Sequence, residues 1–500
     1  MSIQHIRIEN FKKFSDITLD LTCPITLIYG ENSSGKSSAL RAILGLVQTF
    51  SQNNKYQSWN AQGELVDLGL YKDYIKDHNV KNKFSISLQS HLYSPYEFKH
   101  RRNSKARHVT EQKFTYEYDS ATSQAKIHSF HETTTSLDSK VLLTELINHG
   151  LKGSTTGPIS PCYTSIKISK PKTRSHYNLT VDGLALRSSF GSPDHAPDWM
   201  QEELSGANTA TEVTFDQRLS ISETNEKKKH KSGAFMKLRL YERAIEESAT
   251  FLSRVHYLGP LRMSPLRSYK LTSHTSEVGP TGELTPLVLS YLYKKSQQDK
   301  TKSKIHKLRY EKFCRWFQYI FPDYEISVEP SEDVVRLKVK HAGRTDSITD
   351  VGFGFSQVLP ILVQASAMES GDTLIIEQPE LHLHPKAQVA FSTFVTEASK
   401  SGVKFIIETH SEHLLRGLQL NISNHELDPQ KGLKSSNVKI YYFHREDKIT
   451  NMTLNQWGEI EGGWPEGFFD ESYQISSQIL KNKISAMTAN TAERKTEASE

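Results

Sequence analysis

Cysteine, long apolar runs and a strong excess of one charge are all scarce in this 500-residue sequence. The 3 cysteines, Cys23, Cys162 and Cys314, lie far apart, which disfavours a disulfide framework or a zinc knuckle and favours a reducing, cytoplasmic location. No stretch approaches the roughly 18 apolar residues of a membrane-spanning helix, and the N-terminus has no apolar signal-peptide core. The net charge is only +5, so composition alone does not indicate a nucleic-acid binder.

Apolar material is nevertheless sufficient for a sizeable core, at 36% hydrophobic and 10% aromatic residues. Residues 3–8 and 17–21 alternate apolar and polar side chains, which predicts two half-buried strands. An apolar run at 25–29 predicts a buried strand that ends at Gly30. Apolar residues at helical spacing then predict a helix over 37–50.

The middle of the chain and its C-terminal third differ in their patterns of apolar and polar residues. Alternating segments separated by turns predict an antiparallel sheet in the middle, with strands at 84–88, 114–118, 163–168 and 177–181. Residues 183–234, rich in Ser, Thr, Asn and Lys, predict a loop-rich insertion, and 235–255 have a helical pattern. Apolar runs at 373–376 and 403–407 predict buried parallel strands with helices on both faces of their sheet.

The most specific motif is the segment 30–37, which fits G-x-x-x-x-G-K-[ST] and lies between a predicted strand and a predicted helix. In such a loop, backbone amides and the helix N-terminus surround phosphates. Lys36 would reach the β- and γ-phosphates and Ser37 would bind Mg²⁺, so ATP and Mg²⁺ are the expected ligands. An ordinary Gly/Ser turn is the alternative. The residues expected to contact nucleotide here are Gly30, Asn32, Ser33, Ser34, Gly35, Lys36, Ser37 and Ser38.

Three weaker motifs follow in the C-terminal third. The strand at 373–376 ends at Glu377, where a Walker B motif places a carboxylate facing the metal. The segment 352–357 leads into a predicted helix and would form another anion site, although a glycine turn selected only for its geometry has the same composition. A further strand ends near His410, which taken alone is equally consistent with an ordinary buried polar group.

Together, the order and spacing of these motifs resemble the ABC-type ATPase head, and within that class the OLD-like and RecF/SMC-like branch. The opening strand and two later stretches resemble other marks of this branch, namely IRIENFKKF at 6–14, LHLHP at 381–385 and THSE at 409–412. Two more segments are similar to a prokaryotic AAA-family subgroup often found beside phage-defence genes, YLGPLR at 257–262 and WPEGFFD at 464–470.

The resemblance implies an α/β fold: a P-loop ABC-type ATPase head with a mostly parallel sheet flanked by helices, an antiparallel β subdomain and an inserted middle region. We expect the N-terminal part of the head at 1–75 and an antiparallel, loop-rich insertion at 76–249, which the resemblance does not cover. A helical region and the C-terminal part of the head are expected at 250–475, followed by a tail at 476–500.

The resemblance also assigns roles to residues outside the phosphate loop. It implies a signature loop that completes the nucleotide site of a second protomer, so that a homodimer or higher homo-oligomer encloses two ATP molecules. It makes His410 the switch histidine at the γ-phosphate and places Lys12 and Phe14 near the adenine. Gln62 becomes the Q-loop glutamine, with a plain surface glutamine as the alternative. The residues implied for the signature loop are Gly352, Gly354, Ser356 and Gln357.

One departure from the family pattern concerns hydrolysis. The usual Walker B pair is Asp followed by Glu, whereas this chain has Glu377 followed by Gln378. A glutamine amide orients water but cannot take its proton, so we expect slow hydrolysis, with Glu380 or His410 as candidates to assist the water. The expected catalytic residues are therefore Glu377, Gln378, Glu380 and His410, and the expected metal ligands are Ser37 and Glu377. For His382 and His384, a phosphate-side or packing role is favoured over metal binding.

The leading functional hypothesis is an ATP-driven switch that controls a separately encoded effector, such as a nuclease, in bacterial antiphage defence. The motivation is that the chain has a nucleotide-binding motif but no Asp-x-Asp pair after the helix that follows His410, where many OLD-type proteins continue into a nuclease domain built around clustered carboxylates. The main alternative is a RecF/SMC-like ATPase that binds DNA, for which basic stretches at 101–107, 227–231 and 294–309 could contact phosphates or be only solvated surface. A transporter subunit is disfavoured by the long insertion, and no membrane partner is expected. A catalytically inert binding module stays open because of Gln378.

Overall fold

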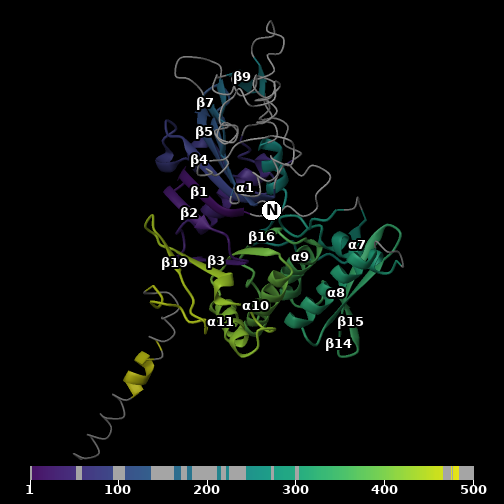
Figure 1. Ribbon diagram of the computed structural model, residues 1–500. Helices are drawn as coiled ribbons and strands as arrows, with labels where there is room; N and C mark the ends of the chain where they lie inside the picture. The colour runs from purple at the N-terminus through teal and green to yellow at the C-terminus, as the bar shows by residue number, and fades with distance from the viewer. Residues whose placement is uncertain are drawn as a thin grey trace, which may run out of the picture.

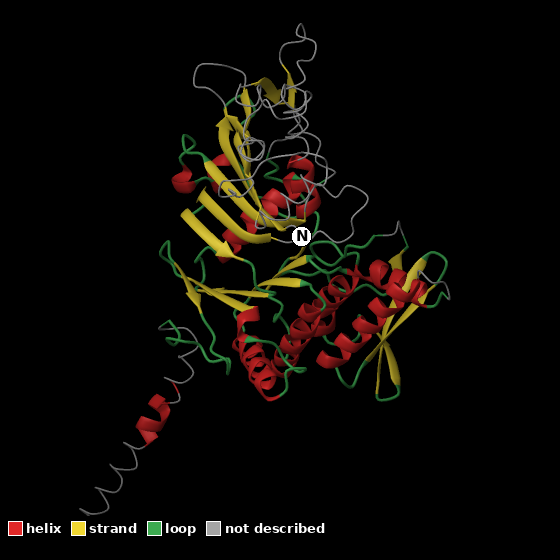
Figure 2. Cartoon of the chain, in the orientation of Figure 1, coloured by secondary structure: helices red, strands yellow, loops and turns green. Residues whose placement is uncertain are grey.

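A computed structural model of the chain describes residues 3–51, 59–93, 107–136, 163–169, 177–182, 211–215, 221–223, 244–271, 275–298, 303–465, 475 and 477–483. This described part contains three sheets and the helices that cover them (Figures 1 and 2). A mostly parallel sheet lies in the middle, with an antiparallel sheet on one side and a layer of helices on the other. The expected α/β fold is therefore confirmed.

The middle sheet has the strand order β11-β16-β17-β3-β18-β19, and all neighbouring pairs are parallel except β18 with β19. Successive residues of β3 point to opposite faces, because Ile28 belongs to the core under the antiparallel sheet whereas Leu27 and Tyr29 belong to the core under the helices. Both faces are thus covered. The strands are β3 (Ile25–Gly30), β11 (Val255–Leu258), β16 (Thr373–Glu377), β17 (Lys404–Glu408), β18 (Val438–Phe443) and β19 (Ile449–Met452).

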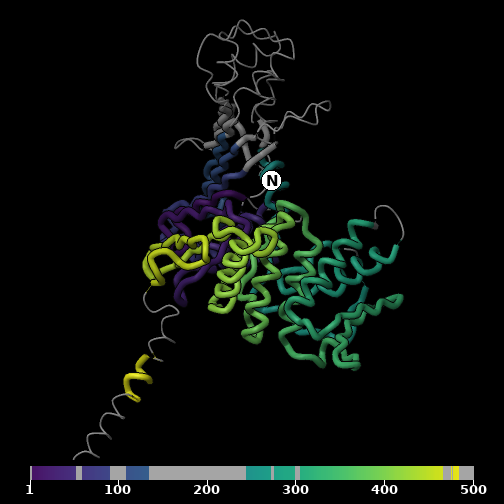
Figure 3. Tube along the Cα trace, turned by 60° about the horizontal axis from the view of Figure 1, so that its bottom comes forward, coloured from purple at the N-terminus to yellow at the C-terminus, as the bar shows by residue number. Residues whose placement is uncertain are grey.

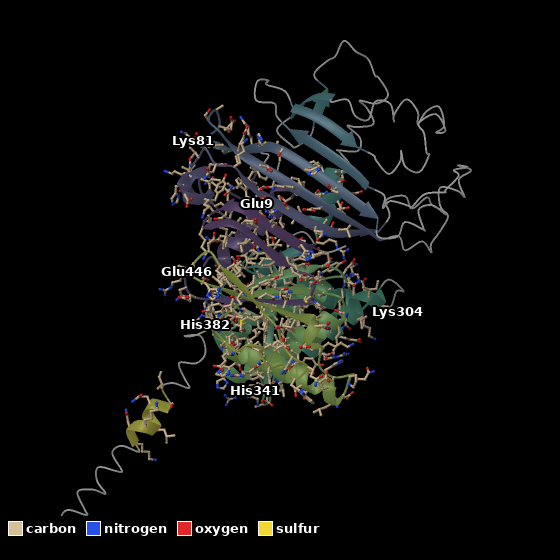
Figure 4. The ribbon with its side chains drawn as sticks, turned by 60° about the vertical axis from the view of Figure 1, so that its left-hand side comes forward. Glu9, Lys81, Lys304, His341, His382 and Glu446 are labelled. Atoms are coloured by element: carbon tan, nitrogen blue, oxygen red, sulfur yellow. The ribbon has the colours of Figure 1, made fainter. Side chains whose placement is uncertain are left out.

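The antiparallel sheet has the order β10-β9-β8-β7-β6-β5-β4-β1-β2. Glu9 of β1, labelled in Figure 4, accepts hydrogen bonds from Ser85 of β4 and Lys113 of β5, so the N-terminal strands are tied to the middle of the chain. The antiparallel sheet therefore contains strands from both sides of residue 75. We propose this position as the boundary between the N-terminal part of the head and the insertion, so the two parts share one sheet. Its strands are β1 (Ile3–Phe11), β2 (Phe14–Asp20), β4 (Phe84–Tyr93), β5 (Arg107–Asp119), β6 (Gln124–Ser136), β7 (Tyr163–Ser169), β8 (Tyr177–Asp182), β9 (Thr211–Phe215) and β10 (Ile221–Glu223).

Helices cover the remaining surfaces of the middle sheet. α1 follows β3 and packs into the core that the two large sheets share. Figure 3 shows α9, α10 and α11 together in green, with α7 and α8 beside them in teal. The long helices are α1 (Lys36–Thr49), α7 (Thr285–Ser296), α8 (Ser303–Ile320), α9 (Phe353–Ala367), α10 (Pro385–Lys400) and α11 (Glu412–Leu427). Short helical turns lie at α2 (Tyr71–Tyr74), η1 (Lys76–His78) and η3 (Ser435–Asn437).

A small antiparallel sheet packs beside α7 and α8. Its strands are β12 (Tyr269–Lys270), β13 (Glu325–Pro330), β14 (Val334–His341) and β15 (Arg344–Ser347). Buried side chains of β14, including Val335 and Leu337, belong to the same core as Phe313 and Phe317 of α8. This sheet therefore supports the helices that precede the glycine loop at 352–354.

The strands and helices expected from periodicity occur where the structure describes them. Of the helical pattern at 235–255, the described residues 244–252 are helical and β11 begins at Val255, while residues 235–243 lie outside the described residues. Most of the loop-rich segment 183–234, the basic stretch 227–231, most of 101–107, and residues 466–470 and 484–500 lie outside the described residues. Within the described part, none of the helices has the length and apolar character needed to span a bilayer.

Candidate functional site

A glycine-rich loop joins the end of β3 to the start of α1. Gly30 has a φ of 146°, and a Cβ there would lie 2.3 Å from the carbonyl oxygen of Phe443, so only glycine fits. Gly35 precedes α1 with a φ of 93°. Lys36 then turns its ammonium group into the loop and donates to the carbonyl oxygens of Gly30 at 3.0 Å and Glu31 at 2.7 Å. Burial lowers the pKa of Lys36. The loop has the form that surrounds a phosphate at a helix N-terminus.

The remaining loop residues differ in exposure. Asn32 and Ser33 are exposed, and Ser33 has a left-handed φ of 62°. Ser34 is fully buried, and its hydroxyl finds no hydrogen-bond partner in the described part of the chain. Ser38 is half-buried in the first turn of α1. The backbone conformation thus brings the whole segment into one loop at the edge of the sheet.

Two acidic residues end adjacent strands next to this loop. Glu377 ends β16 and pairs in register with Glu408, which ends β17. Glu408 in turn pairs with Ile28 of β3, and its Oε1 accepts a hydrogen bond of 3.0 Å from the hydroxyl of Ser37. The carboxyl ends of parallel strands meet at one sheet edge, so Ser37 at the start of α1, Glu408 at the end of β17 and Glu377 at the end of β16 form a row of oxygen ligands.

Burial raises the pKa of both carboxyl groups. For Glu377, the hydroxyl of Tyr257 donates to Oε1 at 2.8 Å and opposes the rise, as does the positive charge of Arg41. For Glu408, burial and the negative charge of Glu377 raise the pKa to about 7, while the hydrogen bond from Ser37 lowers it. The two carboxylates therefore repel each other at an edge where a cation would relieve the repulsion.

The peptide group between Glu377 and Gln378 is held from both sides. Its carbonyl oxygen accepts a hydrogen bond of 2.9 Å from Nη2 of Arg262, and its N–H donates to the carbonyl oxygen of Glu408 at 2.7 Å. Gln378 itself has a left-handed φ of 45°. Since Arg262 is only 6% exposed, this anchor is internal, and it fixes the direction in which Gln378 leaves the strand.

Glu380 connects the segment after β16 to the turn after β17. Its Oε1 accepts from the backbone N–H of His410 at 2.7 Å, and its Oε2 accepts from the hydroxyl of Thr409 at 2.8 Å. Both carboxylate oxygens are therefore occupied in holding this turn. Burial, and then the positive charge of Lys36, lower the pKa of His410, so its imidazole is neutral at pH 7 and lies within electrostatic reach of the phosphate loop.

The glycine loop expected to be the signature starts α9. Gly352 is exposed with open space around its Cα, whereas a Cβ on Gly354 would lie 3.0 Å from the carbonyl oxygen of His382. Ser356 and Gln357 are buried in the first turns of α9. The exposed end at Gly352 is thus the part of this loop that a second molecule can reach, while the Ser356 and Gln357 side chains face the interior.

The three residues predicted near the adenine or at the Q-loop lie in different environments. Phe14 is 1% exposed and packs edge-on against Phe443, with its ring against Gly35, so its faces are covered by protein. Burial and the positive charge of Arg41 lower the pKa of Lys12. Gln62 is exposed beside an isolated bridge to residue 67. Of the three, Phe14 lies directly behind the phosphate loop.

Sequence reasoning missed Glu408, Tyr257 and Arg262 as site residues. The acid at the end of an apolar strand was a usable signal for Glu408, because the strand 404–408 has the same form as the strand ending at Glu377. Tyr257 and Arg262 belong to the YLGPLR segment, but nothing in that segment shows that it meets Glu377.

The residues at the sheet edge fit a magnesium ion. Mg²⁺ commonly takes one or two carboxylates and completes its coordination with phosphate oxygens and water. Ser37, Glu377 and Glu408 supply hard oxygen donors, and Oε2 of Glu408 is buried with no partner among the described residues. No cluster of three or more His, Cys, Asp and Glu side chains placed to hold a metal occurs in the described part. His384 instead caps α10 by accepting from the N–H of Lys386.

Parts of the chain are similar to known protein families and solved structures. Residues 433–474 match a family described as a protein of unknown function, DUF3696, and no curated protein sequence matches the chain. Similar solved structures include an Smc head bound to the C-winged helix domain of ScpA, at 11% identity over 91% of this chain and 99% of that chain, with a TM-score of 0.38.

Two further similar structures are SMC heads from named organisms. The head domain from Thermotoga maritima has 9% identity over 91% of this chain and 100% of that chain, with a TM-score of 0.32. A head with an extended coiled coil, bound to the C-terminal domain of ScpA derived from Pyrococcus furiosus, has 10% identity over 96% of this chain and 99% of that chain, with a TM-score of 0.38. Residues 1–415 match the model of the AAA ATPase domain, and the chain therefore belongs to the AAA ATPase domain family.

Proposed function

We propose that the protein binds ATP with Mg²⁺, hydrolyses it slowly and uses the bound and hydrolysed states as a switch. The observation that carries this proposal is the row formed by Ser37, Glu408 and Glu377 beside the glycine-rich loop. A loop that presents backbone amides and Lys36, next to acidic strand ends, suits a polyphosphate with a divalent cation.

In this proposal each group of the chain has a defined task. Lys36 leaves the carbonyl oxygens of Gly30 and Glu31 and pairs with phosphate oxygens, which are stronger acceptors because they are charged. Ser37 and Glu377 hold Mg²⁺, which when bound neutralises phosphate charge. His410, neutral at pH 7, offers a hydrogen bond near the γ-phosphate rather than a second positive charge.

Slow hydrolysis follows from Gln378. Its direction is fixed by the hydrogen bonds of Arg262 and Glu408 to the preceding peptide group, so the amide can orient a water molecule. The amide cannot accept a proton from that water, which removes a contribution that general bases typically make, about 10²–10⁴-fold in rate. Glu380 is committed to Thr409 and His410, so we assign it a positioning role.

The output of the switch would pass through a second copy of the chain and a separate effector. The exposed end of α9 at Gly352 would close over the nucleotide of the partner copy to form a homodimer. The effector, such as a nuclease encoded nearby, would then respond to the closed state in antiphage defence. The resemblance of the YLGPLR and WPEGFFD segments to defence-associated ATPases supports this assignment.

Lys36→Ala tests the proposal at two levels. We expect the variant to lose steady-state ATP turnover and, when expressed with its neighbouring genes, to lose protection against phage plating. The matched control is Lys81→Ala, which changes an exposed lysine in the turn before β4 that is labelled in Figure 4. Protection and turnover equal to wild type in Lys36→Ala would contradict the proposal.

A second candidate function, DNA binding by an SMC-like ATPase, is favoured by one surface. The end of α7 and the start of α8 expose Lys294, Lys304 and Lys307, and the two helices pack together. Fluorescence anisotropy of a duplex at several salt concentrations tests it, with and without a non-hydrolysable ATP analogue. Direct phosphate contacts predict that each Lys→Ala change reduces the salt slope by about one. Absence of binding at low salt would exclude this candidate.

A further inference from the structure

Glu408 is a buried acid whose environment satisfies only half of its carboxylate. The side chain is 3% exposed, and Oε1 accepts the hydroxyl of Ser37 at 3.0 Å. Oε2 is buried without a hydrogen-bond partner in the described part of the chain. No Lys, Arg or His nitrogen of the described residues forms an ion pair with it within 4.0 Å. A buried carboxylate oxygen without a partner is costly, so its retention indicates a group that binds there.

The position of Glu408 decides what that group is. The residue lies on β17 between β3 and β16, so it separates Ser37 from Glu377 in the row of oxygen donors. Glu377 is 6% exposed, and its Oε1 is bound by Tyr257. Two neighbouring acids facing a serine hydroxyl form a hard, negatively charged donor set, which suits a small divalent cation and repels an anion.

The number of carboxylates at the sheet edge beside the phosphate loop supports the same conclusion. A Walker B pair usually supplies two acids from one strand, whereas here the second position is Gln378. Glu408 provides a second carboxylate from the adjacent strand and lies nearer to the phosphate loop, because its hydrogen bond reaches Ser37 directly. The positive charges that lie closest, Lys36 and Arg41, act on Glu408 from a distance. Lys36 is bonded to loop carbonyls, and Arg41 is exposed.

We propose that Glu408 is a second carboxylate of the divalent-cation site, acting with Ser37 and Glu377 on the cation that accompanies the nucleotide. This inference rests on the proposed nucleotide-binding function and adds to it a residue on β17. Glu408 therefore sets the affinity of the site for the cation.

Binding of Mn²⁺, used as a paramagnetic probe, tests the assignment without relying on turnover. Electron paramagnetic resonance titrations are done with the full chain and a non-hydrolysable ATP analogue. In Glu408→Gln the amide oxygen can still accept the Ser37 hydroxyl, so the variant removes the charge and little else. We expect Mn²⁺ affinity to fall about tenfold or more, the scale found when partners of metal sites are removed. The matched control is Glu397→Gln on the surface of α10, which removes an acid that pairs with Lys400 and should not change Mn²⁺ affinity.

Two further measurements keep the outcomes distinct. With saturating Mg²⁺, a fluorescent ATP analogue should bind wild type and Glu408→Gln alike; no nucleotide binding by wild type under these conditions would overturn the proposed function itself. Normal nucleotide binding with unchanged Mn²⁺ affinity in Glu408→Gln would overturn only the cation assignment. Glu408→Asp restores the charge on a shorter side chain and should recover part of the Mn²⁺ affinity. Equally weak Mn²⁺ binding by Glu408→Gln and Glu408→Asp would indicate that Glu408 has a packing role and would reject the proposal.

Discussion

Replacing Glu380 by alanine tests whether this acid positions the site or handles a proton. In the structure its two oxygens accept the backbone N–H of His410 at 2.7 Å and the hydroxyl of Thr409 at 2.8 Å. A buried donor left without an acceptor costs about 1–3 kcal/mol, and two donors are affected. We therefore expect Glu380→Ala to lower the free energy of unfolding by about 2–6 kcal/mol. Glu380→Gln keeps the shape and one acceptor and should lose less.

A double-mutant cycle with Thr409→Val isolates the interaction. In that background one of the two donors is already gone, so Glu380→Ala should cost about 1–2 kcal/mol less than it does in wild type. The hydroxyl of Thr409 also accepts from the N–H of Ser411 at 3.0 Å, but that loss occurs in both arms of the cycle and cancels. Guanidinium chloride unfolding followed by circular dichroism gives the four free energies. Additivity within about 0.5 kcal/mol would refute the positioning role.

Two further predictions concern backbone fit and pH. Gly30→Ala would place a Cβ 2.3 Å from a carbonyl oxygen of β18, so we expect the free energy of unfolding to fall by about 3 kcal/mol or more and nucleotide binding to weaken. Gly343→Ala is the control for the strained φ alone, because Gly343 has a φ of 77° and a Cβ there would meet nothing within 4 Å. For Asp20, burial opposes but hydrogen bonds from Thr22 and Lys439 lower the pKa to about 2, against 3.8 normally. Its stabilisation is therefore fully present above pH 3.8 and lost as the pH falls through about 2. Asp20→Asn should cost about 1–2 kcal/mol at pH 6 and roughly half as much at pH 3 in parallel thermal melts, whereas an equal cost at both would contradict the assignment.

Local patterns predicted the strands, the phosphate loop and the helix after it because each depends on residues close in sequence. Alternation between 3 and 8 revealed a half-buried strand, and the glycines at 30 and 35 revealed a loop before a helix. Each of these sequence patterns lies within a segment of about ten residues. The structure changed little about them beyond the exact ends of α1 and β3.

Pairing between distant segments could not be predicted in the same way. Alternation shows that Ile6 faces a core but not that it pairs with Leu88 on β4, which makes β1 part of the large antiparallel sheet. The site was incomplete for the same reason. Glu408 becomes a site residue only because β17 lies between β16 and β3, and strand order follows from the whole chain rather than from any one segment. Phe14 likewise packs against Phe443 from the far end of the chain, a contact that no local pattern indicates.

The position of β18 has a practical consequence for producing parts of this protein. The AAA ATPase domain match ends at residue 415, yet β18 pairs with β3 from Val438 with Ile25 to Phe443 with Gly30. Every residue of β3 is buried. A fragment cut at residue 415 would leave this strand as an open, apolar edge, which invites self-association and aggregation. Expression boundaries for crystallography should therefore extend past β19, so that the strand carrying the phosphate loop keeps its neighbour.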